Sequence, residues 1–138
     1  MNPQLIGITI LAVATATALG VFSRARGIAL GEYWRRACTG PSWHRAYPTA
    51  ATEEIRHFLY QFVDAFGFRR RRALQFLPSD RVLAVYRALY PNKNWPDALE
   101  LETFAISLKR RYDLDLRKLW REDLTLGEIF ETIHRGAV

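Results

Sequence analysis

The chain has 138 residues, of which 49% are hydrophobic, and a formal net charge of +6 at pH 7. Residues 23–50 hold five Arg and one acid, a surplus of four, whereas residues 51–138 hold fifteen Lys plus Arg and thirteen Asp plus Glu, a surplus of two. Most of the excess positive charge therefore lies in residues 23–50. This distribution disfavours nucleic acid as the partner and indicates attraction of residues 24–45 to anionic lipid headgroups.

An uncharged apolar run covers residues 5–22 and has only four residues in front of it. About 18 to 20 apolar residues at ~1.5 Å rise cross a hydrocarbon core of ~30 Å, so the run predicts a transmembrane anchor over residues 1–23. A cleaved signal peptide is one alternative, because small residues at 12–18 offer cleavage patterns, but the start of the chain lacks a basic n-region. A buried core helix is another, and it would need partners on all its faces.

Basic residues close to a membrane end remain on the cytoplasmic side. Only the amino terminus is positive before the run, whereas arginines follow it closely. We therefore expect a single-pass protein of the inner membrane, with its amino terminus outside and its carboxy-terminal domain in the cytoplasm. A single cysteine, Cys38, fits a reducing compartment. The segment expected at the membrane surface consists of Arg24, Arg26, Tyr33, Trp34, Arg35 and Arg36.

A second basic cluster is formed by four consecutive arginines at residues 69–72, which follow Gly67. A run this short is commonly a solvated loop or helix edge. Alternatively, the four arginines contact lipid headgroups or an acidic protein partner. Nucleic acid is disfavoured because Phe66 and Phe68 alone do not make the interleaved aromatic platforms of strand-binding proteins.

Gly40, Pro41 and Pro48 interrupt residues 39–49, which predicts a linker. Residues 24–50 would then form a basic juxtamembrane segment and linker, and residues 51–138 a cytoplasmic helical domain. Apolar residues at helical spacing predict a first helix over 51–66 that ends at Gly67, followed by helices near 80–90, 97–112 and 117–121 and a final one from 125. The fold class is therefore all-α, with one transmembrane helix and a bundle of four to five helices.

Two helix starts are marked by capping boxes. Asp97 with Glu100 opens one helix, and Thr125 with Glu128 opens the last. The first of these helices has an apolar inner stripe and basic residues in its last turn, which suit the negative end of the helix dipole. The stripe consists of Leu101, Phe104, Ala105, Leu108 and Tyr112.

These motifs resemble the second half of an acyl carrier protein. The stretch DALEL at residues 97–101 stands where that family has Asp-Ser-Leu, LKRRYDLDL at 108–116 matches its aromatic-Asp-aliphatic-acid-aliphatic turn, and LTLGEI at 124–129 matches the start of its last helix. Residues 51–66 would be the first helix of the family, and LPSDRV at 77–82 its loop motif. The helical pattern at 80–90 departs from the family, which has a shorter irregular loop there.

The resemblance implies a fold rather than the family's chemistry. Carrier proteins bear a phosphopantetheine arm on the motif serine, and that position is Ala98 here, which has no hydroxyl. The helix also ends in Lys109, Arg110 and Arg111, so the basic docking enzymes of ordinary carrier proteins are not expected as partners. The residues expected to form a partner-docking surface are Asp97, Leu101, Glu102, Lys109, Arg110 and Arg111.

No catalytic constellation, cofactor motif or metal-ligand spacing is present, since His44, His57 and His134 lie far apart in the sequence. We therefore expect a membrane-anchored, non-catalytic docking or scaffold protein. An alternative is an accessory or assembly subunit of a larger inner-membrane complex, held through the transmembrane helix, whose small residues would allow close helix packing. A third hypothesis, an enzyme acting on lipids or acyl groups, needs a site that the sequence does not show.

Overall fold

The computed structural model describes residues 3–91 and 98–136, with only the backbone at 3–12, 22, 23 and 25. All the regular elements among these residues are helices, and they contain no strand, only an isolated bridge between Arg81 and Thr125. The all-α class follows the sequence patterns. The elements are α1 (Pro3–Trp34), α2 (Gly40–Ala46), α3 (Thr52–Ala65), the 3-10 helix η1 (Arg70–Gln75), α4 (Val82–Leu89), α5 (Leu99–Tyr112), α6 (Leu116–Leu119) and α7 (Leu126–Gly136).

The predicted transmembrane helix is wrong. Within residues 3–91 and 98–136, the structure contains no helix with both the length and the apolar character needed to cross a membrane. The apolar run belongs to a 32-residue helix, α1, which continues through Arg24, Arg26 and Glu32. This finding overturns both the single transmembrane helix of the predicted fold and the predicted location as a single-pass inner-membrane protein with its amino terminus outside.

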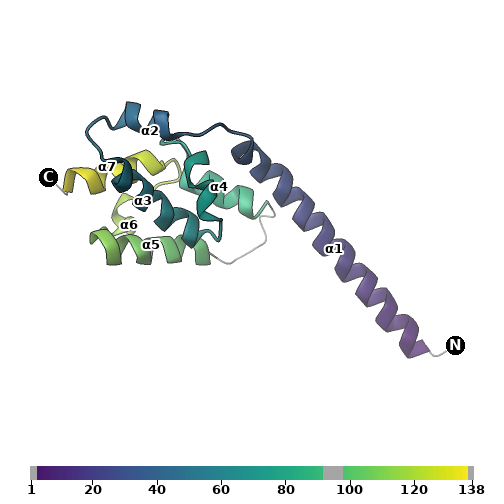
Figure 1. The fold of residues 1–138 in the computed structure, drawn as a ribbon. Coiled ribbons are helices and arrows are strands. Elements are labelled where there is room, and N and C mark those ends of the chain that lie inside the picture. Colours follow the sequence, from purple (N-terminus) through teal and green to yellow (C-terminus); the bar gives the residue numbers. More distant parts are fainter. Residues whose placement is uncertain (1–2, 92–97, 137–138) are drawn as a thin grey trace.

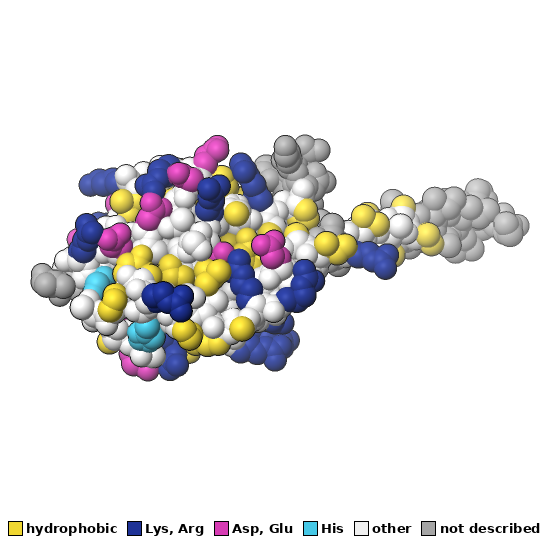
Figure 2. Space-filling model, turned by 90° about the horizontal axis from the view of Figure 1, so that it is seen from above, with side chains coloured by type: hydrophobic (Ala, Val, Ile, Leu, Met, Phe, Trp, Pro, Cys, Tyr) yellow, Lys and Arg dark blue, Asp and Glu magenta, His cyan; other side chains and the backbone are white. Residues whose placement is uncertain are grey.

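Helix α1 extends away from the remaining helices, which pack together as one domain (Figure 1). Only its carboxyl end enters the core, where Leu30 and Tyr33 are buried. Hydrophobic and basic side chains are both exposed along its free part, and Lys, Arg, Asp and Glu side chains are interspersed over the domain surface (Figure 2). The exposed large hydrophobic residues of α1 are Val13, Leu19, Val21 and Ile28.

Helix α3 is the centre of the domain core, as its apolar spacing predicts. Its inward face is nearly inaccessible, and Phe62 contacts both Phe76 (ring centroids 5.0 Å apart) and Phe104 of α5 (5.4 Å). The predicted stop is confirmed: Gly67 has φ +72°, and the N–H of Phe68 donates to the carbonyl of Val63 at 2.8 Å. A glycine suits this left-handed helix end because it has no Cβ.

The predicted linker at 39–49 contains a helix, α2, and a core residue. The Trp43 side chain is fully buried, and its Nε1 donates to the carbonyl of Phe76 at 2.8 Å. The Thr39 hydroxyl donates to the same carbonyl, also at 2.8 Å. The indole packs edge-on against Phe130 of α7. Residues before the predicted domain boundary at 51 therefore close the core over α3 and α7.

The capping box predicted at the start of α7 is confirmed. The N–H of Glu128 donates to the Thr125 hydroxyl at 3.2 Å, and the N–H of Thr125 donates to the Glu128 carboxylate at 2.9 Å. The next residue after the helix start, Gly127, lies so close to the preceding loop that a Cβ would come within 2.8 Å of the Pro78 carbonyl and of the Tyr47 hydroxyl. The absence of a side chain is therefore required where α7 crosses this loop.

Helix α5 packs Phe104 and Leu108 into the core. The Asp97 of the predicted capping box lies outside the described residues, and the residue at the helix start is Ala98, which makes no side-chain cap. At the other end, Asp113 takes a left-handed conformation with φ 53°. This turn reverses the chain so that the buried Leu116 brings α6 against α5.

An ion pair between Arg36 and Asp80 joins the end of α1 to the loop before α4. The Arg36 guanidinium binds the carboxylate with two bonds of 2.6 and 2.9 Å, and a further N–H donates to the Gln75 carbonyl at 3.2 Å. Asp80 is only 8% exposed and also accepts the N–H of Leu77. The hydrogen bond to Asp80 raises the pKa of Arg36.

We predict that Arg36→Met lowers the free energy of unfolding by about 3 kcal/mol, because it leaves the buried Asp80 carboxylate without its cation. The matched control is Arg70→Met, since Arg70 also makes a two-bond pair, with Asp64, but both side chains are largely exposed. The control should lose about 1 kcal/mol or less. Urea unfolding followed by circular dichroism measures both values, and equal losses would contradict the stabilising role of the Arg36–Asp80 pair.

The Tyr90 hydroxyl, at the end of α4, donates to the Glu100 carboxylate of α5. Burial and this bond raise the pKa of Tyr90 to about 12. An unfolded tyrosine ionises near its ordinary value of 10.0, so ionisation favours the unfolded chain as the pH rises from about 10 to about 12.

We predict that the wild-type chain loses more stability across this window than Tyr90→Phe, with both chains measured by urea unfolding. Ultraviolet titration of the phenolate, corrected with Tyr90→Phe, should show the Tyr90 pKa moving down toward 10 in Glu100→Gln. An unchanged titration curve in Glu100→Gln would show that the carboxylate does not raise this pKa.

Candidate functional site

An apolar groove lies between α5 and α6 and has a volume of about 210 Å³. We call it the α5–α6 groove. Its walls combine apolar side chains in the centre with one acidic and one basic side chain. The lining residues are Leu101, Glu102, Ala105, Leu116, Arg117 and Trp120. Its apolar walls suit an apolar side chain of a ligand.

The groove owes its shape to two turns of the chain. The left-handed Asp113 ends α5, and the Asp115 carboxylate then accepts the N–H of Arg117 at 3.1 Å, which caps α6. Because α6 is only four residues long, Trp120 follows directly and adds its side chain to the lining of the groove. Helix α5 supplies the opposite wall through Leu101 and Ala105, which are one helical turn apart.

Large apolar side chains are exposed in this groove and on the outer face of α5. Trp120 is 38% exposed, and Leu99 and Ile106 on the outer face of α5 are each 58% exposed. Leu99 and Ile106 are seven residues apart and therefore lie on the same side of the helix. Aromatic residues with partial exposure beside an apolar recess are typical of protein-binding surfaces.

The rim of the groove carries opposite charges at its two sides. Glu102 lies on α5, and Arg117 lies on α6. Arg117 pairs with Asp115 at 3.3 Å, but its side chain is 89% exposed, so this pair contributes little and leaves the guanidinium available to a partner.

The predicted docking residues separate into groups. Leu101 and Glu102 line the α5–α6 groove, whereas Arg110 and Arg111 line another hollow of about 430 Å³, beside Gln61 of α3. Lys109 donates to Asp113, and this bond raises the pKa of Lys109 and lowers that of Asp113. Asp97 lies outside the described residues.

The structure adds groove residues that the sequence patterns did not indicate, namely Ala105, Leu116, Arg117 and Trp120. A tryptophan among charged residues, in RKLWRED at 117–123, is the sequence signal that could indicate Trp120. Ala105 and Leu116 have apolar positions that suit a core equally well, so their pattern alone does not distinguish a groove wall from a core residue.

The residues predicted at a membrane surface differ in their exposure and contacts. Arg24 and Arg35 are exposed, and Arg26 is half-buried. Tyr33 is a core residue, while Trp34 packs edge-on against Phe68 and Phe76. Arg36 is held by Asp80.

The position of the carrier-protein serine, Ala98, lies at the start of α5, adjoining the outer face that bears Leu99. Among the described residues, no three His, Cys, Asp or Glu side chains are grouped closely enough to hold a metal ion. No family model, no curated protein and no solved structure matches the chain. The resemblance to acyl carrier proteins therefore rests on the sequence motifs alone.

Proposed function

We propose that the chain is a non-catalytic docking protein that binds a helix of a partner protein in the α5–α6 groove. The observation that carries the proposal is an apolar recess bounded by Leu101 and Ala105 on one side and by the partly exposed Trp120 on the other. An amphipathic helix laid into an apolar groove uses side chains at i, i+3, i+4 and i+7, and the outer apolar residues of α5 extend the contact.

Charge around the groove determines what kind of helix fits. Helix α5 begins with Glu100 and Glu102, while basic residues gather toward its end and on α6. The matching partner helix therefore has a basic residue near Glu102 and acidic residues near the opposite end, beside its apolar stripe. Arg117 lines the groove itself, Lys118 follows it on α6, and Lys109 lies in the last turn of α5.

The carrier-like motifs support the same function. In carrier proteins this helix both carries the phosphopantetheine arm and docks to partner enzymes. With Ala98 in place of serine there is no hydroxyl for the arm, so only the docking role is left. The proposal predicts that a broad-specificity phosphopantetheinyl transferase with coenzyme A leaves the intact mass of the chain unchanged.

Photocrosslinking tests the groove directly. A photoreactive phenylalanine analogue in place of Trp120, in the full chain expressed in its native cells, should crosslink to a discrete partner at an amphipathic helical segment. The same analogue in place of the exposed Thr132 of α7 should not. Ala105→Arg fills the groove and should reduce the crosslink about tenfold, as expected for loss of a central contact.

The matched control for Ala105→Arg is Thr103→Arg, which adds the same charge at an exposed position of the same helix. It should leave the crosslink intact. Equal reduction by both variants, or a crosslink that Ala105→Arg does not change, would contradict docking in the groove. A crosslinked product that contains only a second copy of the chain would show that the groove mediates self-association and does not bind a partner helix.

A second candidate function is supported by α1: assembly into a larger complex whose protein helices surround it. Every described side chain from 13 to 21 is exposed, and Val13, Leu19 and Val21 are each more than 60% exposed. The Thr17 hydroxyl donates to the Val13 carbonyl at 2.8 Å, so it is satisfied within the helix. A helix without a polar face is ordinarily enclosed by apolar neighbours.

The double variant Leu19→Gln, Val21→Gln separates the two candidates. Each variant is purified from cells, and its mass is measured by light scattering after size exclusion. If assembly depends on α1, the double variant should have the mass of the isolated chain, whereas the wild-type chain and Ala105→Arg should have the mass of the complex. Retention of the complex by the double variant would exclude α1 as the assembly contact. Loss of the complex in Ala105→Arg alone would assign assembly to the groove.

A further inference from the structure

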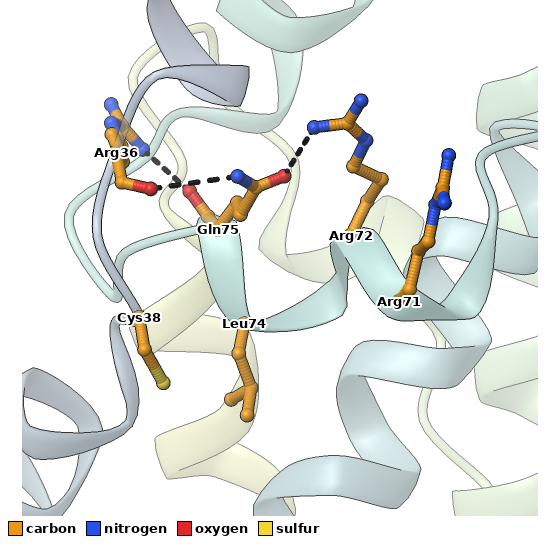
Figure 3. A pocket seen from close by; sticks show the side chains of 6 residues that line it. All are labelled: Arg36, Cys38, Arg71, Arg72, Leu74 and Gln75. Atoms are coloured by element: carbon orange, nitrogen blue, oxygen red, sulfur yellow. Dashed lines mark hydrogen bonds between the residues drawn. The ribbon is translucent and has the colours of Figure 1, made fainter.

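A third recess, of about 610 Å³, lies between the end of α1, the segment after it and η1 (Figure 3). We call it the arginine hollow. It is formed by other elements than the α5–α6 groove, so a ligand bound here would be independent of docking in that groove. Its lining residues are Arg36, Cys38, Arg71, Arg72, Leu74 and Gln75.

Gln75 organises the hollow. Its Nε2 donates to the Trp34 carbonyl at 2.9 Å, and its Oε1 accepts an N–H of Arg72 at 2.9 Å. Its own backbone carbonyl accepts from Arg36. In Figure 3, Arg71 and Arg72 extend from η1 on the same side, and Arg36 lies across Gln75 from them. The side chain of Gln75 thus fixes the spacing between the two groups of positive charge.

The three arginines of the hollow differ in how their charge is compensated. Arg36 is paired with Asp80. Among the described residues, the Arg72 guanidinium has only neutral partners: it donates to Gln75 and lies over the ring of Trp34, 4.6 Å from the centroid. The Arg71 side chain makes no hydrogen bond or ion pair to another residue in the part of the chain that the structure describes. Two adjacent cations therefore border the hollow without an acidic partner there.

Two uncompensated cations next to each other repel, and an anion that contacts both relieves this repulsion. Arg72 is already held by Trp34 and Gln75, so a ligand loses little free energy in ordering it. Planar guanidinium groups present pairs of N–H donors that match phosphate oxygens. We propose that the arginine hollow binds a phosphate-bearing ligand, with Arg71 and Arg72 as its charged contacts.

The geometry favours a phosphate group over other anionic partners. A phosphate monoester or diphosphate concentrates two or more negative charges in one compact group, which fits two neighbouring guanidiniums, whereas acidic peptide side chains carry one charge each. Proteins that bind single-stranded nucleic acid also use aromatic faces that stack on bases. The ring of Trp34, which lies under the guanidinium of Arg72, is covered by Arg72 and by contacts with Phe68 and Phe76.

Inorganic pyrophosphate is the probe for the test, with the full chain. Calorimetry should show saturable binding of one pyrophosphate per chain, and thermal unfolding should shift upward with its concentration. Arg71→Gln should weaken binding about tenfold, because it removes charge-assisted hydrogen bonds. Arg72→Lys keeps the charge but loses the planar fork, and it should also weaken binding.

The matched control is Arg69→Gln. Arg69 belongs to the same run of four arginines but does not line the hollow, so the variant should change affinity by less than about twofold, through screened long-range charge alone. Arg71 is exposed, so Arg71→Gln should leave the thermal midpoint without ligand unchanged. Equal weakening by Arg69→Gln and Arg71→Gln would show diffuse charge attraction and overturn the proposal.

Sedimentation with vesicles distinguishes the two sources of the phosphate group. Vesicles of phosphatidylcholine with phosphatidic acid present a phosphate monoester, and phosphatidylserine vesicles serve as an anionic comparison. Binding to phosphatidic acid that pyrophosphate displaces and Arg71→Gln abolishes would assign a lipid headgroup. Binding of pyrophosphate without such vesicle binding would assign a soluble phosphate ester.

The proposal fails if neither pyrophosphate nor the phosphatidic acid vesicles bind saturably. It also fails if a polyglutamate peptide or a DNA duplex binds more tightly than pyrophosphate with the same dependence on Arg71. Tighter binding of the peptide would assign an acidic protein segment as the ligand of the hollow, and tighter binding of the duplex would assign a nucleic acid.

Discussion

The pairing of Arg36 with Asp80 holds together parts of the chain that are distant in the sequence. Asp80 lies in a short loop whose backbone is hydrogen-bonded to the start of α7. The Asp80 carbonyl accepts the N–H of Leu126 at 2.9 Å, and the Pro78 carbonyl accepts the N–H of Gly127. The carboxylate of the same residue binds the chain just after α1. One residue thus fixes the end of α1 to the start of α7, and a charge without Arg36 at this position would be costly to bury.

An aromatic network transmits this arrangement to the surfaces of the domain. Phe76, which follows η1, contacts Trp34 at 5.7 Å and Phe62 at 5.0 Å between ring centroids, and Phe62 in turn contacts Phe104 of α5. Close-packed rings of this kind adjust little on ligand binding. The arginine hollow beside η1 and the α5–α6 groove therefore rest on the same rigid core, although they present different chemistry, one cationic and the other apolar.

The sequence predicted the features that depend on local interactions. The buried face of α3, its stop at Gly67 and the capping box of Thr125 with Glu128 all arise within a few residues of chain, and helical spacing or turn chemistry is enough to identify them. The burial of Trp43 depends on a hydrogen bond to Phe76, 33 residues away, which no local pattern contains.

The same reason limited the prediction of the sites. Of the predicted docking residues, Leu101 and Glu102 line the groove, and the helical pattern of α5 is enough to place them on that helix. The α6 wall depends on how the chain reverses at Asp113, which the helical pattern does not show. The apolar run near the amino terminus predicts a transmembrane helix from its own length and hydropathy, but in the structure it is part of α1, which continues through Arg24, Arg26 and Glu32. The sequence neighbours of Tyr33 and Trp34 indicate a membrane surface, whereas both rings contact Phe76.

The burial of Trp43 has a practical consequence for dividing the chain into fragments. A fragment beginning at residue 51, where the helical pattern starts, would lack the indole that covers Phe58 and Phe130, and it would also lose the cation that compensates Asp80. Its exposed rings would favour aggregation during expression. The smallest piece with an intact interior begins ahead of Leu30, so the carboxyl end of α1 has to be counted as part of the folding unit.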